Sequence, residues 1–445
     1  MRRICLALPT NRACAGTIAD VAEEAAHAAA EFGVEVHLLV LDSSDPDALA
    51  EHTRTVRALP PAPGVVVHHL DEERQADFLG RAVRRAGVAE PERVLGLLLP
   101  DAVSYGACTN RAFLVAAALG CTSVHRRDSD STYQLLDGKP VFPIHHELRS
   151  LGRRAADVVP DVSKSLLEPA DAAKPVSLVG GSFIGELSVD VSEIRALDPD
   201  LYYDVVSLWA PPVWTEEQTR ELVAESFTGG GTEPFTRDES VLGAPDIRRI
   251  DMCNLALHHE VYERIPLPPA PDTIGSDYFL LHVVLDATLP GVVHNRHIVN
   301  HYTPERRTGA GFTAYQVRFV KFLLSMLYLY PVYGEMTVTA GALLDERHRV
   351  RVDAVLDMVR RSTGTDRADN HHRLAVLDRS YRQLGGKYAE FADHLVPIRE
   401  RLLDEAQADA EDFARLIEAW GPLVAAARAE DPSGVGAPST EAPTG

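Results

Sequence analysis

Short apolar runs and longer amphipathic segments alternate along the first hundred residues. Three of the short runs are rich in Val, Leu or Ile, as buried strands are: residues 4–8, 34–41 and 64–69. The segments that follow them have the length and the polar–apolar pattern of helices: residues 19–32, 46–59 and 72–86. Strands and helices that alternate in this way predict an α/β fold, with a mostly parallel sheet and helices on both of its faces.

Polar residues follow the first two predicted strands. Pro9, Thr10 and Asn11 end the first run, and Asp42 and Asp45 flank the polar turn after the second. In parallel sheets, ligands bind beyond the carboxyl ends of the strands. We therefore expect this edge of the sheet to carry a binding site.

The pattern changes after Gly311. Strand signals become rare, and four helical segments follow: residues 312–330, 341–361, 372–384 and 387–428. We therefore predict an α/β domain over 1–311 and a C-terminal helical domain over 312–428, whose helices are a candidate homodimer interface. Residues 429–445 are rich in Pro, Gly, Ser, Thr and Ala and are predicted to be disordered.

The composition is that of an ordinary soluble protein, with 45% hydrophobic and 24% charged residues. The formal charge of −21 disfavours nucleic acid and anionic membranes as partners. Five scattered cysteines without a CxxC pair indicate reduced thiols and a cytoplasmic location. No signal peptide is expected, since the first apolar run stops at Pro9, and the apolar stretch 319–333 is too short to span a membrane.

Two common phosphate-binding motifs are missing, and an acidic pair stands in their place. The first strand is not followed by GxGxxG, which argues against a dinucleotide-binding dehydrogenase. The sequence also lacks the motif GxxxxGK followed by Ser or Thr, which argues against a P-loop enzyme. Asp128 and Asp130 are two residues apart, so in an extended segment they point to the same side. Hard oxygen ligands placed in this way can hold a divalent cation that also binds substrate phosphates. Considered alone, such a pair is more often a solvated acidic turn.

A second candidate for nucleotide binding lies upstream of the acidic pair. Asn110 and Arg111 come just before the apolar helix predicted over 112–119. An arginine at a helix start can bind a nucleotide phosphate or base. A surface arginine in a local ion pair is the simpler alternative.

Four segments, in order, resemble the motifs of nucleotide-sugar glycosyltransferases with the GT-A fold, in particular family 2. Pro9-Thr10-Asn11-Arg12 resembles their "P-T-x-x-R" loop, and Asp42-Ser43-Ser44-Asp45 resembles their "D-x-S-x-D" turn. Residues 105–111 resemble the "G-x-x-x-A-R-N" helix start, with the last two letters reversed, and Asp128-Ser129-Asp130 resembles the DXD metal motif.

The resemblance implies a Rossmann-like GT-A domain over 1–311 and a set of ligands for the donor. It places the nucleotide against nine residues: Pro9, Thr10, Asn11, Arg12, Asp42, Ser44, Asn110, Arg111 and Asp128. It places Mn²⁺ or Mg²⁺ on Asp128 and Asp130, with a UDP sugar favoured over a GDP sugar as donor.

The resemblance continues on the acceptor side. Residues 176–185 read as a strand with a glycine-rich bend, and the segments 250–262 and 274–280 are similar to "G-N-x-A-x-R-R-x-x-F … G-E-D-x-x-L". Asp277 holds the position of the catalytic base in inverting members, while Ser276 stands where many members have a second acid. Asp277 could instead cap the following helix, and a retaining mechanism stays open.

A histidine cluster follows at His294, His297 and His301. In the GT-A pattern a histidine on a late strand completes the metal site, and His301 fits best, with His297 as the second candidate. Arg306 and Arg307 could then clamp the diphosphate, or could equally be solvated. A different reading makes the three histidines a zinc site of a hydrolase, although no HExxH supplies its general base.

The sequence therefore predicts a metal-dependent glycosyltransferase. Its donor would be a nucleotide-diphosphate sugar, and its acceptor a small molecule, a natural product or a peptide. The alternatives are the zinc-dependent hydrolase and a catalytically inactive GT-A-like binding protein.

Overall fold

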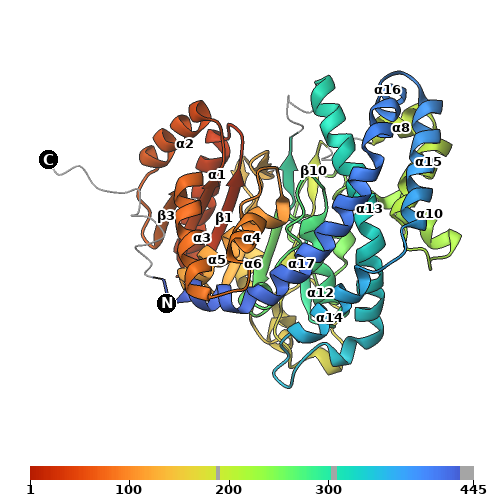
Figure 1. The fold of residues 1–445 in the computed structure, drawn as a ribbon. Helices are drawn as coiled ribbons and strands as arrows, with labels where there is room; N and C mark the ends of the chain where they lie inside the picture. The colour runs from red at the N-terminus through yellow and green to blue at the C-terminus, as the bar shows by residue number, and fades with distance from the viewer. Residues whose placement is uncertain (187–190, 302–307, 431–445) are drawn as a thin grey trace.

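The apolar runs of the N-terminal half form adjacent strands of one large sheet. The computed structural model describes residues 1–186, 191–301 and 308–430 (Figure 1). Nine strands make up this sheet: β1 (Arg3–Thr10), β2 (Glu35–Asp42), β3 (Val65–Leu70), β4 (Ser123–Arg127), β8 (Lys164–Ser165), β9 (Leu178–Gly180), β11 (Ser240–Gly243), β12 (Asn254–His258) and β13 (Gly291–His294). Their order across the sheet is β3-β2-β1-β4-β12-β9-β13-β11-β8.

The sheet is mostly parallel. β1 runs parallel to both β2 and β4, β2 is parallel to β3, and the pairs β13–β9 and β11–β8 are also parallel. Antiparallel pairing occurs where β12 lies between β4 and β9, and between β11 and β13. The predicted α/β class with a mostly parallel sheet is confirmed.

Alternate residues of β1 face two different layers of helices. Ile4, Leu6 and Leu8 pack with α1 (Ala15–Phe32) and α2 (Pro46–Ala58). Cys5 and Ala7 point to the other face, where the covering helices are α3 (Glu72–Ala86), α4 (Pro91–Leu98) and α5 (Tyr105–Ala118). This two-residue alternation of a fully buried strand confirms the predicted helices on both faces.

A smaller three-stranded sheet lies beside the large one. It consists of β10 (Phe183–Gly185), β14 (Ile298–Asn300) and β5 (Ser131–Tyr133), in that order. The predicted glycine-rich bend is the passage from β9 to β10. A Cβ on Gly181 would come within 2.8 Å of Asn254 Nδ2 and 2.9 Å of the His294 ring, so only glycine fits there without movement. A hairpin follows β5, made of β6 (Leu135–Leu136) and β7 (Lys139–Pro140).

Short helices connect the middle of the chain, and long ones complete it. The middle part holds α6 (Ile144–Ser150), α7 (Ala155–Val158), α8 (Ser192–Leu197), α9 (Pro199–Val206), α10 (Glu216–Glu225), α11 (His259–Tyr262) and α12 (Phe279–Asp286). The C-terminal part holds α13 (Gly309–Thr339), α14 (Val352–Ser362), α15 (Ala368–Leu384), α16 (Gly386–Leu395) and α17 (Arg399–Arg428). The C-terminal part is helical as predicted, but the segment 387–428 divides into α16 and α17, and most of 341–351 precedes α14 as a loop.

The longest C-terminal helices share a core with the sheet. α17 passes across α5 and α3 (Figure 1), and its residues Phe413, Trp420 and Leu423 lie in the same buried cluster as Leu39 and Val124 of the strands. A second buried cluster joins α13, α15 and α16 to α9. The predicted division at 311/312 crosses this continuous core and stays a prediction.

Three further expectations concern the cysteines, the membrane and the tail. All five cysteines are free thiols. None of the helices in the described part of the chain is long and apolar enough to cross a membrane. The tail predicted to be disordered lies outside the described residues, except for its first two, of which Glu430 pairs with Arg81 and Arg85.

Candidate functional site

The chain changes direction in the sheet between β1 and β4. After β1 it builds β2 and β3 on one side, and after α5 it returns to place β4 on the other side of β1. Such a switch point leaves a crevice at the carboxyl ends of the two strands, where ligands bind in open α/β sheets. Here the loop after Thr10 meets the loop after Arg127, and Arg12 Nη1 donates to Asp130 Oδ2 at 2.9 Å.

A cavity of about 1070 Å³ opens at this point. Its lining includes both acids of the DXD-like motif, together with Tyr105, Arg126 and Asp277. Arg126 and Asp277 are 151 residues apart in the sequence, so the fold brings together segments that the sequence analysis could connect only through the resemblance. Ligand pockets typically have about 300–1,000 Å³, so this cavity lies at the upper end of that range.

Arg126 connects the acids, and sequence reasoning missed it. The side chain is buried, and its guanidinium donates to Asp277 Oδ2 at 2.6 Å and pairs with Asp128 Oδ1 at 3.1 Å. A signal was available, because a charged residue inside a buried strand is rarely left without a partner. Arg126 precedes Asp128 by two residues, so the two point to the same side of the extended chain.

Asp277 does not cap the helix that follows it. The turn Ser276–Tyr278 and the start of α12 have no side-chain capping bond, and the Asp277 carboxylate instead accepts from Arg126. The capping alternative is therefore wrong. Burial raises the pKa of Asp277 above its ordinary value, although the charge of Arg126 opposes the shift. A buried carboxylate with a raised pKa is a competent general base.

The backbone before Asp277 requires a glycine. Gly275 has φ of 72°, in the left-handed region, and a Cβ there would lie 2.7 Å from the Phe322 ring. The close approach of α13 at Phe322 and the positive φ together fix the turn that directs Asp277 toward Arg126.

The segment predicted to contact the nucleotide through Asn110 and Arg111 holds the backbone instead. Asn110 is fully buried and exchanges two 2.8 Å hydrogen bonds with the main chain of Leu267, one to its carbonyl and one from its N–H. Arg111 donates to the Leu98 carbonyl at 2.9 Å. The structure therefore does not bring these two side chains to the cavity. Asn110 connects α5 to the loop that leads to Asp277, and Arg111 connects α5 to the end of α4.

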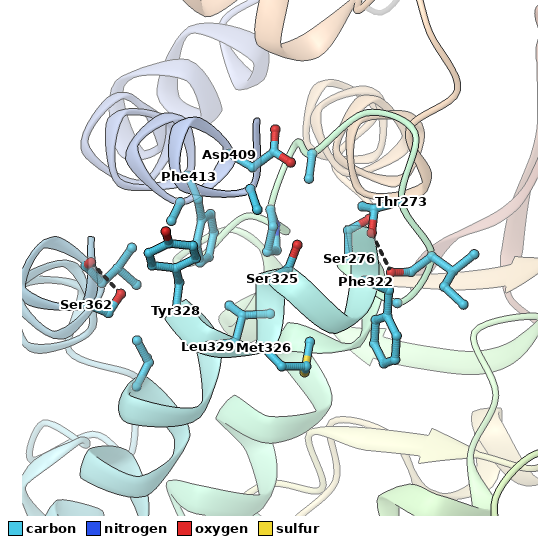
Figure 2. Close-up of a pocket in the computed structure, with 18 residues that line it drawn as sticks. Thr273, Ser276, Phe322, Ser325, Met326, Tyr328, Leu329, Ser362, Asp409 and Phe413 are labelled. Atoms are coloured by element: carbon cyan, nitrogen blue, oxygen red, sulfur yellow. Dashed lines mark hydrogen bonds between the residues drawn. The ribbon is translucent and has the colours of Figure 1, made fainter. Parts of the chain in front are cut away.

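The C-terminal helices support the same loop from the other side. Lys321 of α13 is buried, donates to the Pro271 carbonyl at 2.8 Å and pairs with Asp409 of α17 at 2.9 Å. Figure 2 shows the small space between these elements, a cavity of about 30 Å³ bordered by Thr273, Ser276, Asp409 and Phe413. This cavity is too small for a substrate. The loop before Asp277 is therefore in nearly direct contact with α13 and α17.

Asp42 is buried next to the loop that follows β1 and holds its neighbours through hydrogen bonds. Its side chain has no exposed surface, and it accepts hydrogen bonds from His52 and His69, each at 2.8 Å, and from the Ser44 N–H at 3.0 Å. Burial alone would raise the pKa of Asp42, but these hydrogen bonds outweigh it and hold the pKa below its ordinary value. A direct contact of Asp42 with a nucleotide, as the resemblance implied, is not available in this arrangement.

Through His52, Asp42 is connected to the loop that carries Arg12. His52 accepts from the Cys14 N–H at 2.9 Å, next to the loop that carries Arg12. Ser44 Oγ donates to the Arg12 carbonyl at 3.3 Å. Of the remaining loop residues, Thr10 is buried and bonded to Arg12 main-chain atoms. Pro9 is half-buried and Asn11 exposed.

The main chain of His301 lies beside that of Asp130, and the role of this histidine as a metal ligand stays a prediction. The pairing of β14 with β5 continues by one step, so that the His301 N–H donates to the Asp130 carbonyl at 2.9 Å. Its exposed ring contacts Thr132 Oγ1 at 3.1 Å. His297 is four residues away along an extended strand, roughly 13 Å, and accepts from the Ser182 N–H. One metal ion therefore cannot use both histidines.

The zinc-hydrolase alternative finds no site. His294 is buried and stacks on the His146 ring at 5.2 Å between centroids. Within residues 1–186, 191–301 and 308–430, no three His, Cys, Asp or Glu side chains are grouped to hold a metal ion. Arg306 and Arg307, the suggested diphosphate clamp, lie outside the described residues.

Comparison with known proteins supplies a family for the chain. Residues 2–435 match the family described as "Family of unknown function (DUF6271)". The chain belongs to this family. No curated protein matches its sequence.

Two solved structures are similar at a low level. One is described as a mycobacterial protein, with 18% identity over 73% of this chain and 74% of the other, and a TM-score of 0.33. The other is a mannosyltransferase from Pyrobaculum calidifontis in complex with GDP-Man and Mn²⁺, with 12% identity over 94% of this chain and 88% of the other, and a TM-score of 0.34. At these values neither likeness extends a fold or an activity to this chain.

The residues of the site suit a hard divalent cation that brings its own phosphate ligands. Asp128 and Asp130 present only carboxylate oxygens, which Mg²⁺ and Mn²⁺ prefer. Two carboxylates are sufficient when phosphate oxygens and water supply the other positions. The same pair does not form a complete set of protein ligands, in agreement with the finding that the described residues contain no group of three His, Cys, Asp or Glu side chains placed to hold a metal ion.

Proposed function

We propose that this protein is a divalent-cation-dependent glycosyltransferase that uses a nucleotide-diphosphate sugar as donor. The observation that carries the proposal is the meeting of Asp128, Asp130 and Asp277 on one cavity at the switch point of the sheet. Two acids there suit a cation-bound diphosphate, and the third, buried and held by Arg126, suits proton abstraction.

In the proposed reaction each residue has a separate role. An acceptor hydroxyl oxygen forms a bond to the anomeric carbon of the sugar while the bond from that carbon to the diphosphate oxygen breaks. The hydroxyl proton passes to Asp277, and the nucleoside diphosphate leaves with the bonding electron pair. Asp128 and Asp130 would hold the cation, which supplies charge neutralisation for the leaving group. Arg126 orients Asp277 through the 2.6 Å hydrogen bond, and its positive charge opposes the burial that raises the pKa of this carboxyl group.

A divalent cation is also expected because the cavity is acidic. Nine carboxylates and three arginines line it, so a diphosphate would meet an excess of negative charge without a cation. The test includes both uridine and guanosine nucleotides, so that it identifies the nucleobase of the donor.

The test is a donor screen with a matched pair of variants. The protein with Mn²⁺ is mixed with a panel of UDP and GDP sugars, and nucleoside diphosphate release is measured together with calorimetric binding of UDP and GDP, with and without Mn²⁺. Asp130→Ala should abolish both metal-dependent binding and release, because it removes a cation ligand. Asp101→Ala, an exposed acid outside the cavity, should change neither.

Two outcomes would contradict the proposal. Wild-type release by Asp130→Ala would place the cation site elsewhere. Metal-dependent binding with no release from any donor, even with acceptors present, would favour the inactive GT-A-like binding protein.

A further inference from the structure

Aromatic side chains form another part of the cavity wall. Trp209 packs against the rings of Phe227 and Phe322, each at 5.6 Å between centroids, and Trp214 lines the same cavity with 39% of its surface exposed. Tyr330 of α13 also lines it, and its hydroxyl donates to the Trp209 carbonyl. Flat apolar molecules are the ligands that such walls accommodate, through burial of area and ring stacking.

The excess of acid in this cavity comes from particular residues. Most of its carboxylates are balanced by arginines, as Glu225 is by Arg248 and Glu335 by Arg361. Among the described residues, Asp251, Asp286 and Asp369 have no ion-pair partner, although all three line the cavity. A cavity with this charge disfavours an anionic ligand and favours a cationic one.

Asp286 is the acid whose environment is least favourable without a ligand. It lies at the end of α12, is only 9% exposed, and accepts a single hydrogen bond, from Thr337 Oγ1 at 2.8 Å, on Oδ1. Its Oδ2 is buried without a hydrogen-bond partner. Burial raises the pKa of Asp286 to about 6. A buried carboxylate in this state destabilises the fold unless a cation or donor meets it.

We propose that the acceptor is an amine-bearing, largely apolar molecule, with its aromatic part against Trp209, Trp214 and Phe227 and its ammonium group paired with Asp286. The role of this ligand as the acceptor rests on the proposed function, whereas its chemistry rests on the cavity alone. The ammonium group has no free electron pair, so the sugar would be transferred to a hydroxyl of the same molecule. Aromatic faces add cation–π attraction for such a ligand.

The experiment is a binding titration without donor, metal or turnover. Three probes share one ring system and differ in charge: 2-(1-naphthyl)ethylamine, 2-(1-naphthyl)ethanol and 1-naphthaleneacetate. Calorimetry gives the affinity, and quenching of tryptophan fluorescence gives the location, because Trp420 is fully buried elsewhere and only Trp209 and Trp214 line the cavity. The amine should bind at least roughly 10-fold more tightly than the carboxylate, as one charge-assisted hydrogen bond allows.

Two variants separate charge from packing. Asp286→Asn keeps the shape of the side chain and its bond to Thr337, and should weaken amine binding by roughly 10-fold while leaving the neutral alcohol within about two-fold. Because burial disfavours the Asp286 charge, this variant should melt at no lower temperature than the wild type at pH 7. Glu335→Gln removes a carboxylate that Arg361 already balances and should leave amine binding unchanged.

Carboxylate binding as tight as amine binding, no amine binding at millimolar concentration, or an unchanged affinity in Asp286→Asn would each overturn the proposal. None of these results depends on a nucleotide. Amine binding in a protein that binds no nucleotide would therefore refute the proposed function and support the ligand chemistry, and the reverse result would do the opposite.

Discussion

A single buried arginine determines how the acids of the site behave. Arg126 contacts both Asp128 and Asp277, and its side chain is buried at the wall of the cavity. Removing one carboxylate leaves the guanidinium with the other, so the pair of acids and the arginine act as one unit. The charge of each acid must therefore be interpreted together with that of its partners.

Replacing Asp277 by Asn tests its role as the base. Asn still accepts a hydrogen bond from Arg126, and Asp128 still balances the arginine charge, so the melting temperature should change little. The basic group is lost, and turnover with a confirmed donor should fall by roughly 10²–10⁴-fold at unchanged donor affinity. Turnover is measured by nucleoside diphosphate release.

The stereochemistry of the product is the independent check on Asp277. An inverted anomeric configuration, read by NMR, is expected if a base deprotonates the acceptor directly. A retained configuration together with near wild-type turnover of the Asn variant would contradict the base role and favour a retaining mechanism.

Between the elements, the contact of α5 with the loop before Asp277 is the tightest in the site. A Cβ on Gly106 would lie 1.9 Å from the Pro268 carbonyl oxygen, so the helix can approach the loop only because this residue is glycine. Asn110, one turn later, bonds the main chain of Leu267. The two contacts together fix the position of the loop that carries Asp277 into the cavity.

Gly106→Ala should separate these elements. The backbone carbonyl of Pro268 must move, at a cost of about 1–3 kcal/mol, and the displaced loop should lower turnover as well. Gly96→Ala in α4 is the matched control, because a Cβ there meets nothing within 4 Å. That variant should be neutral or more stable by about 0.4–1 kcal/mol. Denaturant unfolding measures both, and equal stabilities of the two variants would mean that the loop accommodates the methyl group.

At the scale of the whole molecule, the last helix belongs to the core of the sheet. α17 buries eight apolar side chains larger than alanine: Leu402, Leu403, Phe413, Leu416, Ile417, Trp420, Leu423 and Val424. Trp420 also donates to the Tyr262 carbonyl at 2.7 Å. At roughly 1.5–3 kcal/mol for each buried side chain, the helix contributes as much as the roughly 5–15 kcal/mol net stability of a typical protein.

A chain that ends at Ile398 should therefore not fold. Without α17, the faces of α3 and α5 that it covers become exposed to water, and we expect no cooperative thermal transition by circular dichroism. Glu418→Ala, on the exposed side of α17, serves as the control and should melt like the wild type. A cooperative transition of residues 1–398, with nucleotide binding preserved, would instead show that the α/β part folds without α17, as a separate domain over 1–311 requires.

The sequence by itself determined the layers of the fold and the positions where polar residues interrupt them. Apolar runs at 4–8, 34–41 and 64–69 could be predicted as strands because periodicity and burial depend on near neighbours along the chain. The helices after them, and the long C-terminal helices, could be predicted for the same reason. Asp128 and Asp130 were visible as a pair because their spacing alone places them on one side of an extended segment.

Only the tertiary structure decided which of these residues meet. Arg126 and Asp277, Asn110 and Leu267, and His301 and Asp130 are joined by hydrogen bonds across more than 150 residues of sequence. Asp42 was predicted to touch a ligand, but in the structure it is buried and bonded to His52 and His69. Local pattern carries no information on such contacts, because strand order and helix packing are set by the burial of whole faces, and a side chain's charge and accessibility follow from what those faces bring beside it.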